Sequence, residues 1–396
     1  MSALSDHIAQ QGARYLMPNY RRFPLVITRG AGSWVWDADG KKYLDLFPGW
    51  GVAGLGHCHP AVAAALARQA QKLLHCANNY YTEEQIEFAA LLSTRADGQQ
   101  IFFCNSGAEA AEGAIKLARL ASDGRYGVIS FYGAFHGRTF AAISATGQPA
   151  YRRGFEPTVP GFAHAEYNNL ASVEALIDDR TCAIMVEPVQ GESGVIAATP
   201  EFLRGLRKLC DEKKLRLIFD EVQTTPARLG TWFGYQHFGV KPDILTSAKA
   251  IAGGMPLGIF MADASVAQFL KPGTHASTFG GNSIGCAAGV AAIKVIEQEN
   301  LLANIQTLGK LLDARINALR QKTAKIKDYR RVGFMVAVEL NVEGAPVVAQ
   351  CAANGVLINC THDTVLRLLP AFNTSADEFD FGLTVLEKAI VGVEQS

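Results

Sequence analysis

Short apolar runs alternate with helical segments through the middle of the chain. Polar or glycine-containing residues follow each run. The runs cover residues 101–103, 126–130, 182–186, 215–219 and 244–246. Residues 60–73 show helical periodicity, and a second helix is predicted at about 107–121. This alternation predicts βαβ units and a mainly parallel sheet buried on both faces, with chemistry gathered beyond the carboxyl ends of its strands.

The two ends of the chain have a different character. Residues 33–36 and 42–46 flank an Asp/Gly turn and predict a β-hairpin. After residue 282 we expect two long helices followed by three strands. These elements cover residues 283–298, 301–322, 335–340, 356–359 and 365–368. The pattern predicts a large domain of residues 51–282 and a small α+β domain made of residues 1–50 and 283–396.

Composition narrows the class of protein. The 396 residues include 37 Lys+Arg and 37 Asp+Glu, and this neutral balance argues against binding nucleic acid through its phosphates. Hydrophobic residues make up 49% and charged residues 19%, as in a globular protein. Neither a secretory signal nor an apolar stretch of about 18 residues is visible. Eight cysteines without a CxxC pair suit reduced thiols. We therefore expect a cytoplasmic enzyme that does not associate with membranes.

Three candidate residues follow the predicted strands. Ser106 has Glu109 three residues later, which is a capping-box pattern, and free N–H groups at that helix start would suit a phosphate. Asp220 lies at the tip of a buried strand and needs a cationic partner, for which a protonated pyridine nitrogen would serve. Lys249, if desolvated, becomes a nucleophile able to form a Schiff base. The plain alternatives are two helix caps and a lysine that reaches solvent.

Two arginines and two histidines also stand out. Arg138 follows an aromatic residue in a loop, whereas Arg367 lies within an apolar run, where a buried cation requires a carboxylate. A structural ion pair is the alternative for both. His57 and His59 resemble a metal-binding tripeptide, but side chains on an extended segment point to opposite faces. No metal site is predicted.

The order of these motifs resembles the class III (ornithine-type) pyridoxal-phosphate aminotransferases over nearly the whole chain, and most closely the acetylornithine aminotransferases among them. The matching stretches are residues 43–45, 55–60, 105–109, 115–119, 135–139, 187–192, 218–223, 243–250, 278–282 and 365–367. The resemblance implies pyridoxal 5'-phosphate as cofactor. It also implies an α/β fold, the PLP-dependent transferase fold type I, with a mostly parallel seven-stranded sheet in the large domain.

The resemblance also implies a role for each cofactor contact. Lys249 would bind the cofactor covalently and later carry the proton, and Asp220 would keep the pyridine nitrogen protonated. Gln223 would contact the phenolic oxygen, and Phe135 would stack on the ring. The turn that would bind the phosphate consists of Ser106, Gly107 and Ala108. Thr278 would reach the phosphate from the other subunit, which implies a homodimer with shared active sites.

Four further residues would hold the substrates. Arg138 would bind the α-carboxylate of an N-acylated ornithine, and Arg367 that of glutamate or 2-oxoglutarate. Glu192 would pair with Arg367 for the first substrate and swing away for the second. Tyr20 falls where the family often has a tyrosine near the substrate carboxylate.

The reaction so implied converts N-acetylornithine and 2-oxoglutarate to N-acetylglutamate semialdehyde and glutamate, a step of arginine biosynthesis. Succinylornithine, free ornithine or 4-aminobutyrate are alternative donors. A semialdehyde aminomutase, or a PLP-binding protein without activity, are more distant alternatives.

The loop of residues 225–227 and Gly113 depart from the family pattern, and Trp50 occupies a position that varies with substrate in the family. Residues 225–227 read Thr-Pro-Ala where two glycines are usual, so the loop should adopt another conformation if those glycines needed positive φ. Gly113 lies inside the predicted phosphate helix, where alanine is usual, at a cost of about 1 kcal/mol. Trp50 is expected to reshape the distal part of the substrate pocket.

Overall fold

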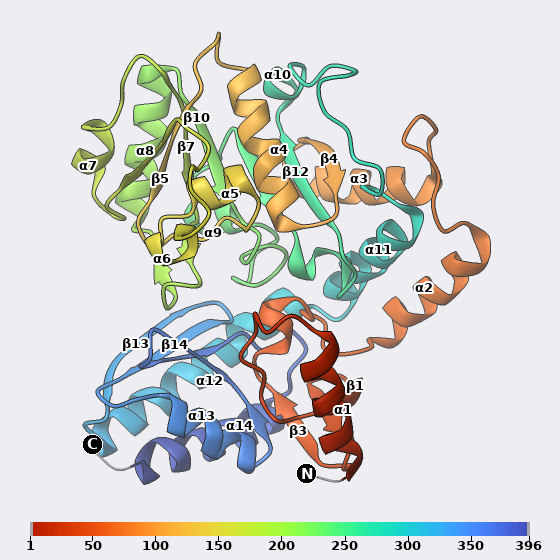
Figure 1. Ribbon diagram of the computed structural model, residues 1–396, viewed down its shortest axis with the longest axis vertical. Helices are drawn as coiled ribbons and strands as arrows, with labels where there is room; N and C mark the ends of the chain where they lie inside the picture. The colour runs from red at the N-terminus through yellow and green to blue at the C-terminus, as the bar shows by residue number, and fades with distance from the viewer. Residues whose placement is uncertain (1–2, 394–396) are drawn as a thin grey trace.

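The computed structural model describes residues 3–393. Figure 1 shows two bodies: one is built around a central sheet, and the other gathers both ends of the chain. The central sheet has seven strands in the order β4-β12-β11-β10-β7-β5-β6. The strands are β4 (Gln100–Cys104), β5 (Gly127–Phe131), β6 (Phe162–Ala165), β7 (Thr181–Val186), β10 (Arg216–Asp220), β11 (Ile244–Ser247) and β12 (Gly258–Ala262). In this sheet β12 runs opposite to the other six strands, so the predicted mostly parallel sheet is confirmed.

Helices cover both faces of this sheet, which explains the continuous apolar runs. Successive strand residues enter different cores: Ile218 packs with α4 (Gly107–Leu120), and Phe219 packs with α8 (Pro200–Lys213). The shorter elements around the sheet connect these layers. They are α3 (Glu83–Arg95), α5 (Phe140–Ala145), α6 (Pro149–Arg152), α7 (Leu170–Glu174), β8 (Val189–Gln190), β9 (Ile196–Ala197), α9 (Gly234–Phe238), η2 (Lys249–Ala252) and α10 (Ala264–Ala267).

The second body contains two four-stranded sheets. The predicted hairpin is present as β2 (Trp34–Asp37) and β3 (Lys42–Asp45), with Trp34 opposite Leu44. A parallel pairing of β3 with β15 (Val356–Leu357) joins the two chain ends. The other elements here are α1 (Ala3–Tyr15), β1 (Ile27–Ala31), η1 (Pro48–Gly51), α12 (Leu301–Lys322), β13 (Ile326–Val332), β14 (Met335–Leu340), α13 (Ala345–Ala353), β16 (Asn359–Thr361), β17 (Val365–Leu368) and α14 (Ala376–Gly392).

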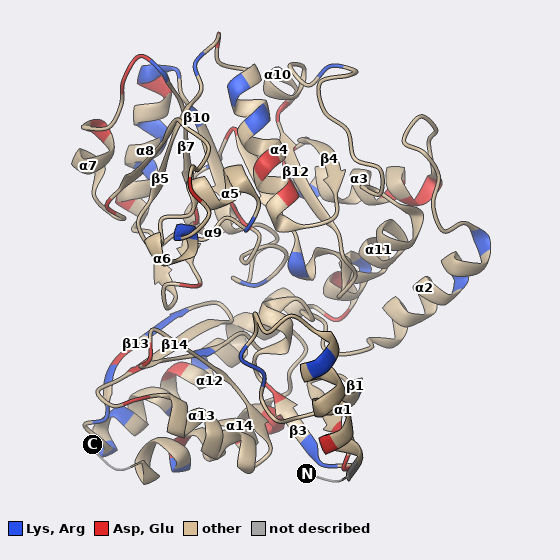
Figure 2. Cartoon of the chain, viewed as in Figure 1, with Lys and Arg blue, Asp and Glu red and all other residues tan. Residues whose placement is uncertain are grey.

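Two helices lie between the bodies. α2 (Pro60–Lys72) packs on α11 (Ser283–Gln298), and α11 sends side chains into the cores of both bodies. In the view of Figure 2, acidic and basic residues are interspersed over both bodies, in keeping with the equal numbers of each charge. Among the described residues, no helix combines the length and apolar character that a membrane span requires.

Candidate active site

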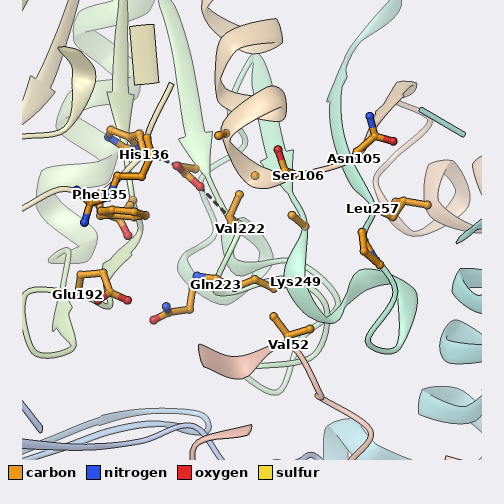
Figure 3. A pocket seen from close by; sticks show the side chains of 18 of the residues that line it. Val52, Asn105, Ser106, Phe135, His136, Glu192, Val222, Gln223, Lys249 and Leu257 are labelled. Carbon is orange, nitrogen blue, oxygen red and sulfur yellow. Dashed lines mark hydrogen bonds and ion pairs between the residues drawn. The ribbon is translucent and has the colours of Figure 1, made fainter. Parts of the chain in front are cut away.

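A cavity of about 450 Å³ opens where β10 and β11 end and α4 begins. It brings together most of the site residues predicted from the sequence. Those that line it are Ser106, Gly107, Ala108, Phe135, Arg138, Glu192, Asp220, Gln223 and Lys249. Figure 3 shows Glu192, Gln223 and Lys249 converging on the space below the strand ends. The volume is within the usual range for a small-molecule site.

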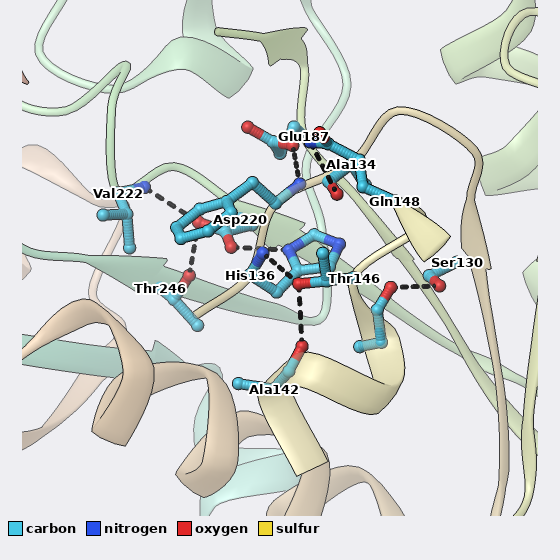
Figure 4. Close-up of polar contacts among 12 residues, drawn as sticks. Ser130, Ala134, His136, Ala142, Thr146, Gln148, Glu187, Asp220, Val222 and Thr246 are labelled. Carbon is cyan, nitrogen blue, oxygen red and sulfur yellow. Dashed lines mark hydrogen bonds and ion pairs between the residues drawn. The ribbon is translucent and has the colours of Figure 1, made fainter. Parts of the chain in front are cut away.

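Asp220 ends β10 and is only 4% exposed. Its Oδ2 lies 2.7 Å from Nδ1 of His136, and its Oδ1 accepts hydrogen bonds from the Val222 N–H (3.0 Å) and the Thr246 hydroxyl (3.2 Å) (Figure 4). Residues 222–229 form turns and no helix starts directly after Asp220, so this residue is not the helix cap that the plain alternative supposed. Three donors thus hold the carboxylate in place at the cavity wall.

His136 is a functional candidate to which the sequence alone assigned no role. Its ring is buried, its backbone N–H donates to the Thr146 hydroxyl (3.0 Å), and that hydroxyl donates to the Ala142 carbonyl (3.0 Å). A histidine beside Phe135 in a loop at a strand end was the available signal. Its pairing with Asp220, 84 residues away in the chain, is visible only in the fold.

Lys249 lies two residues after the end of β11 at Ser247 and has a left-handed backbone, with φ of 48°. Burial lowers the pKa of its amine, although Glu192, Asp220 and Glu187 act in the opposite direction. Within residues 3–393, no hydrogen bond or ion pair engages this amine. A lowered pKa increases the neutral, nucleophilic fraction. The amine therefore faces the cavity and is available for chemistry.

The turn at the start of α4 has the predicted cap with one difference. The Ser106 hydroxyl accepts from the Glu109 N–H (3.1 Å), but the Glu109 carboxylate reaches the backbone N–H of Asn105 (2.5 Å), not that of Ser106. A Cβ on Gly107 would lie 2.9 Å from a methyl of Val222, so only glycine fits there without a shift. Because Ser106, Gly107 and Ala108 line the cavity, the free N–H groups at the start of this 14-residue helix lie at the cavity wall.

Glu192, which lines the cavity, forms an ion pair with Arg367, which does not line the cavity itself. Arg367 is 1% exposed and donates to Oε1 of Glu192 (3.0 Å), to its Oε2 (3.3 Å) and to the Gly191 carbonyl (2.7 Å). Its guanidinium also lies over the Phe47 ring. Burial alone would raise the pKa of Glu192, but Arg367 and Lys249 hold it below its usual value. The buried arginine thus has the carboxylate that its apolar strand required.

Glu187 is a second residue to which the sequence assigned no role. Its Oε1 accepts from the backbone N–H of Phe135 (2.8 Å), and it lines the cavity. Burial, together with the charge of Asp220, raises its pKa well above the ordinary value. Glu187 therefore ties the end of β7 to the loop that carries Phe135 and Arg138.

Several predicted residues lie outside this cavity. Tyr20 and Trp50 line a second cavity of about 710 Å³ next to η1, so Trp50 does not reshape the first cavity within this chain. Thr278 is exposed and does not line the cavity of its own chain. His57 and His59 bind different partners, the carboxylates of Asp45 (2.9 Å) and Glu299 (3.2 Å).

The loop of residues 225–227, which lacks the two glycines usual in the family, still contains a residue with a left-handed backbone. Ala227 has φ of 65° and is fully buried. Thr225 uses its hydroxyl to donate to the buried carboxylate of Glu221 (2.5 Å), which also accepts from the Thr224 hydroxyl and the Tyr235 N–H. The side chains that replaced glycine therefore have structural partners of their own.

The donor set fits pyridoxal 5'-phosphate. An unpaired amine, a carboxylate at a strand end and the N-terminus of a long helix suit its aldehyde, its pyridine nitrogen and its phosphate respectively. The buried Oε1 of Gln223 has no partner in the described part of the chain, so a polar group in the cavity would satisfy it.

Comparisons with known proteins agree with this geometry. A family model described as aminotransferase class-III matches residues 15–390. An acetylornithine aminotransferase from Caldanaerobacter subterraneus is 43% identical, covering 95% of this chain and 97% of its own. A succinylornithine transaminase from Citrobacter koseri is 41% identical over 93% of each chain. A solved ornithine aminotransferase from Toxoplasma gondii, with PLP at partial occupancy in its active site, has a TM-score of 0.93 at 33% identity, covering 98% of this chain and 94% of that one.

The family model covers almost the whole chain, and the relatives match it over nearly their full length. The chain belongs to the class-III aminotransferases, enzymes that use PLP to move an amino group between an amino donor and a keto acid.

Proposed function

We propose that the protein transfers the δ-amino group of N-acetylornithine to 2-oxoglutarate and releases N-acetylglutamate semialdehyde and glutamate. The observation that carries the proposal is the unequal state of two arginines: Arg138 lines the cavity, whereas Arg367 lies behind Glu192, which lines it. Arg367 is covered by Glu192, whereas Arg138 is exposed and has no carboxylate partner within residues 3–393. One cation is therefore hidden while the other can receive a carboxylate.

This asymmetry suits two substrates that share one pocket. The first donor brings one α-carboxylate, for Arg138, and a neutral acylated chain that gains nothing from a second cation. Glutamate brings a second carboxylate, which can replace Glu192 on Arg367. Exchange of one carboxylate for another keeps the buried guanidinium paired throughout, and this avoids the large cost of an isolated buried charge.

The remaining groups act on the cofactor and on protons. PLP, when bound, supplies an electron sink to the reacting carbon. The amine of Lys249, whose pKa is lowered by burial, would accept the proton from that carbon at Nζ and deliver it to the cofactor. The carboxylate of Asp220 would keep the pyridine nitrogen of the cofactor protonated. His136 fixes the orientation of that carboxylate through Nδ1. Phe135 is oriented by the bond from its N–H to Glu187.

Assembly and location are part of the same proposal. The exposed position of Thr278 supports a homodimer in which this residue reaches the phosphate of the partner subunit. The free cysteines of the described chain support a cytoplasmic location.

Succinylornithine is the second candidate donor, because a succinylornithine transaminase is nearly as similar as the acetylornithine enzymes. The test is a panel of N-acetylornithine, N-succinylornithine, ornithine and 4-aminobutyrate, each with 2-oxoglutarate, followed through glutamate formation. We expect the highest kcat/KM for N-acetylornithine. The Lys249→Ala variant should form no glutamate with any donor. A higher value for another donor, or repeated turnover without 2-oxoglutarate (more than one product per active site), would refute the proposal.

A further inference from the structure

The guanidinium of Arg138 lies over two neighbouring aromatic rings. Its guanidinium carbon lies 4.1 Å from the centre of the Tyr151 ring and 5.6 Å from that of Phe135. The two rings meet edge to face at 5.8 Å. A guanidinium over the face of a tyrosine is attracted by the ring while its N–H groups stay free for an anion.

Tyr151 is itself fastened to the loop that carries Arg138. It belongs to α6, the short yellow helix in Figure 1, which begins at Pro149. The side chain of Gln148 donates to the carbonyls of Gly133 (3.1 Å) and Ala134 (3.4 Å). At Gly147 the two segments touch so closely that a Cβ would lie 1.9 Å from the Phe131 carbonyl oxygen. The ring therefore has a defined place relative to Arg138.

An exposed arginine without a carboxylate partner would otherwise sample many rotamers. Each substrate carboxylate would then have to select one of them, which costs binding free energy. Stacking on a fixed ring selects the rotamer before the substrate arrives.

We propose that Tyr151 is a positioning residue that sets the preference for donors with an α-carboxylate, by holding the Arg138 guanidinium toward the cavity. The inference rests on the proposed function in one respect, namely that Arg138 receives that carboxylate. Tyr151 does not line the cavity itself, so its effect passes through Arg138.

The test compares two donors that differ only in this group. N-acetyl-1,4-diaminobutane is N-acetylornithine without its α-carboxylate. We expect Tyr151→Leu to lower the ratio of kcat/KM for N-acetylornithine to that for N-acetyl-1,4-diaminobutane by about 3- to 20-fold, and Tyr151→Phe to leave it within about 2-fold. In an Arg138→Gln background, Tyr151→Leu should change the ratio no further.

Controls separate this role from a general loss of structure. Tyr126→Leu removes a similar pair, with Arg119 at 6.0 Å from the ring, and should leave the ratio unchanged. Bound-cofactor absorbance checks folding, and Tyr151→Met replaces the leucine variant if that one does not fold. An equal loss with both donors, or an additive loss with Arg138→Gln, would overturn the inference. If the wild type prefers another donor, the proposed function is wrong. The role of Tyr151 is then tested with ornithine and 1,4-diaminobutane, which also differ only in the α-carboxylate.

Discussion

Replacing Gly113 with alanine tests how tightly the phosphate-side helix packs on the sheet. Helix propensity alone predicts a gain of about 1 kcal/mol from this change. The structure predicts the opposite sign. A Cβ at Gly113 would lie 2.2, 2.6 and 3.0 Å from three carbons of the Phe260 ring, on the antiparallel strand β12.

The ring has little room to retreat. Phe260 is 2% exposed and stacks on Phe102, with ring centroids 4.9 Å apart. Overpacking of a filled core costs about 1–3 kcal/mol, so the upper part of this range exceeds the propensity gain. We expect Gly113→Ala to lower the free energy of unfolding by up to about 2 kcal/mol. Because α4 would move off the sheet, the turn at Ser106 would move too, and PLP should bind more weakly.

The assay is denaturant unfolding at fixed protein concentration, together with PLP titration. In a Phe260→Leu background the clash is removed, and the same Gly113→Ala change should raise stability by about 1 kcal/mol. A stabilising effect of Gly113→Ala in the wild-type background would refute the packing argument. An equal loss in both backgrounds would refute the role of Phe260.

Three further outcomes follow from buried charges. Glu192→Gln leaves Arg367 without its carboxylate. The preference for glutamate over N-acetylornithine as donor should therefore rise about tenfold or more in single-turnover assays. An unchanged preference would contradict the proposed exchange of Glu192 for the substrate carboxylate. Burial raises the pKa of Glu221 to about 7, so its protonated form favours folding. The free energy of unfolding should therefore fall by about 3 kcal/mol at most as pH rises from 4.5 through 7, and a Glu221→Gln variant with the same slope would exclude this source. Thr225→Val removes a hydrogen-bond donor to the Glu221 carboxylate and should lower the free energy of unfolding in urea by about 1–2 kcal/mol. An unchanged free energy of unfolding would contradict this contact.

Much of the central sheet could be predicted because its strands are buried on both faces. Continuous apolar runs marked β5, β7, β10 and β11, and each is followed by polar residues at the cavity edge. Strand direction was less accessible: β12 is equally apolar, and its antiparallel course depends on pairing with β4 and β11. The domain boundaries stay a prediction.

The predicted boundary at residue 283 shows why the sequence pattern does not define the domains. It falls at the start of α11, a helix that supplies Cys286 and Ile293 to one core and Ala288 and Ala292 to the other. A pattern of apolar positions cannot tell which of two cores each residue enters.

The site was predictable where chemistry requires a particular residue type at a strand end. Lys249 and Asp220 were singled out for that reason, and both line the cavity. The supports of the site could not be read in the same way. His136, Glu187 and Tyr151 act through partners 84, 52 and 13 residues away, and only the folded chain brings those pairs together.

The most direct measurement concerns the amine that carries the cofactor. The protein loaded with PLP is reduced with borohydride, digested and mapped by mass spectrometry. We predict that the pyridoxyl label is found on Lys249 alone and is lost in Lys249→Ala. Label on another lysine, or none on Lys249 in a protein that still transfers amino groups, would contradict it.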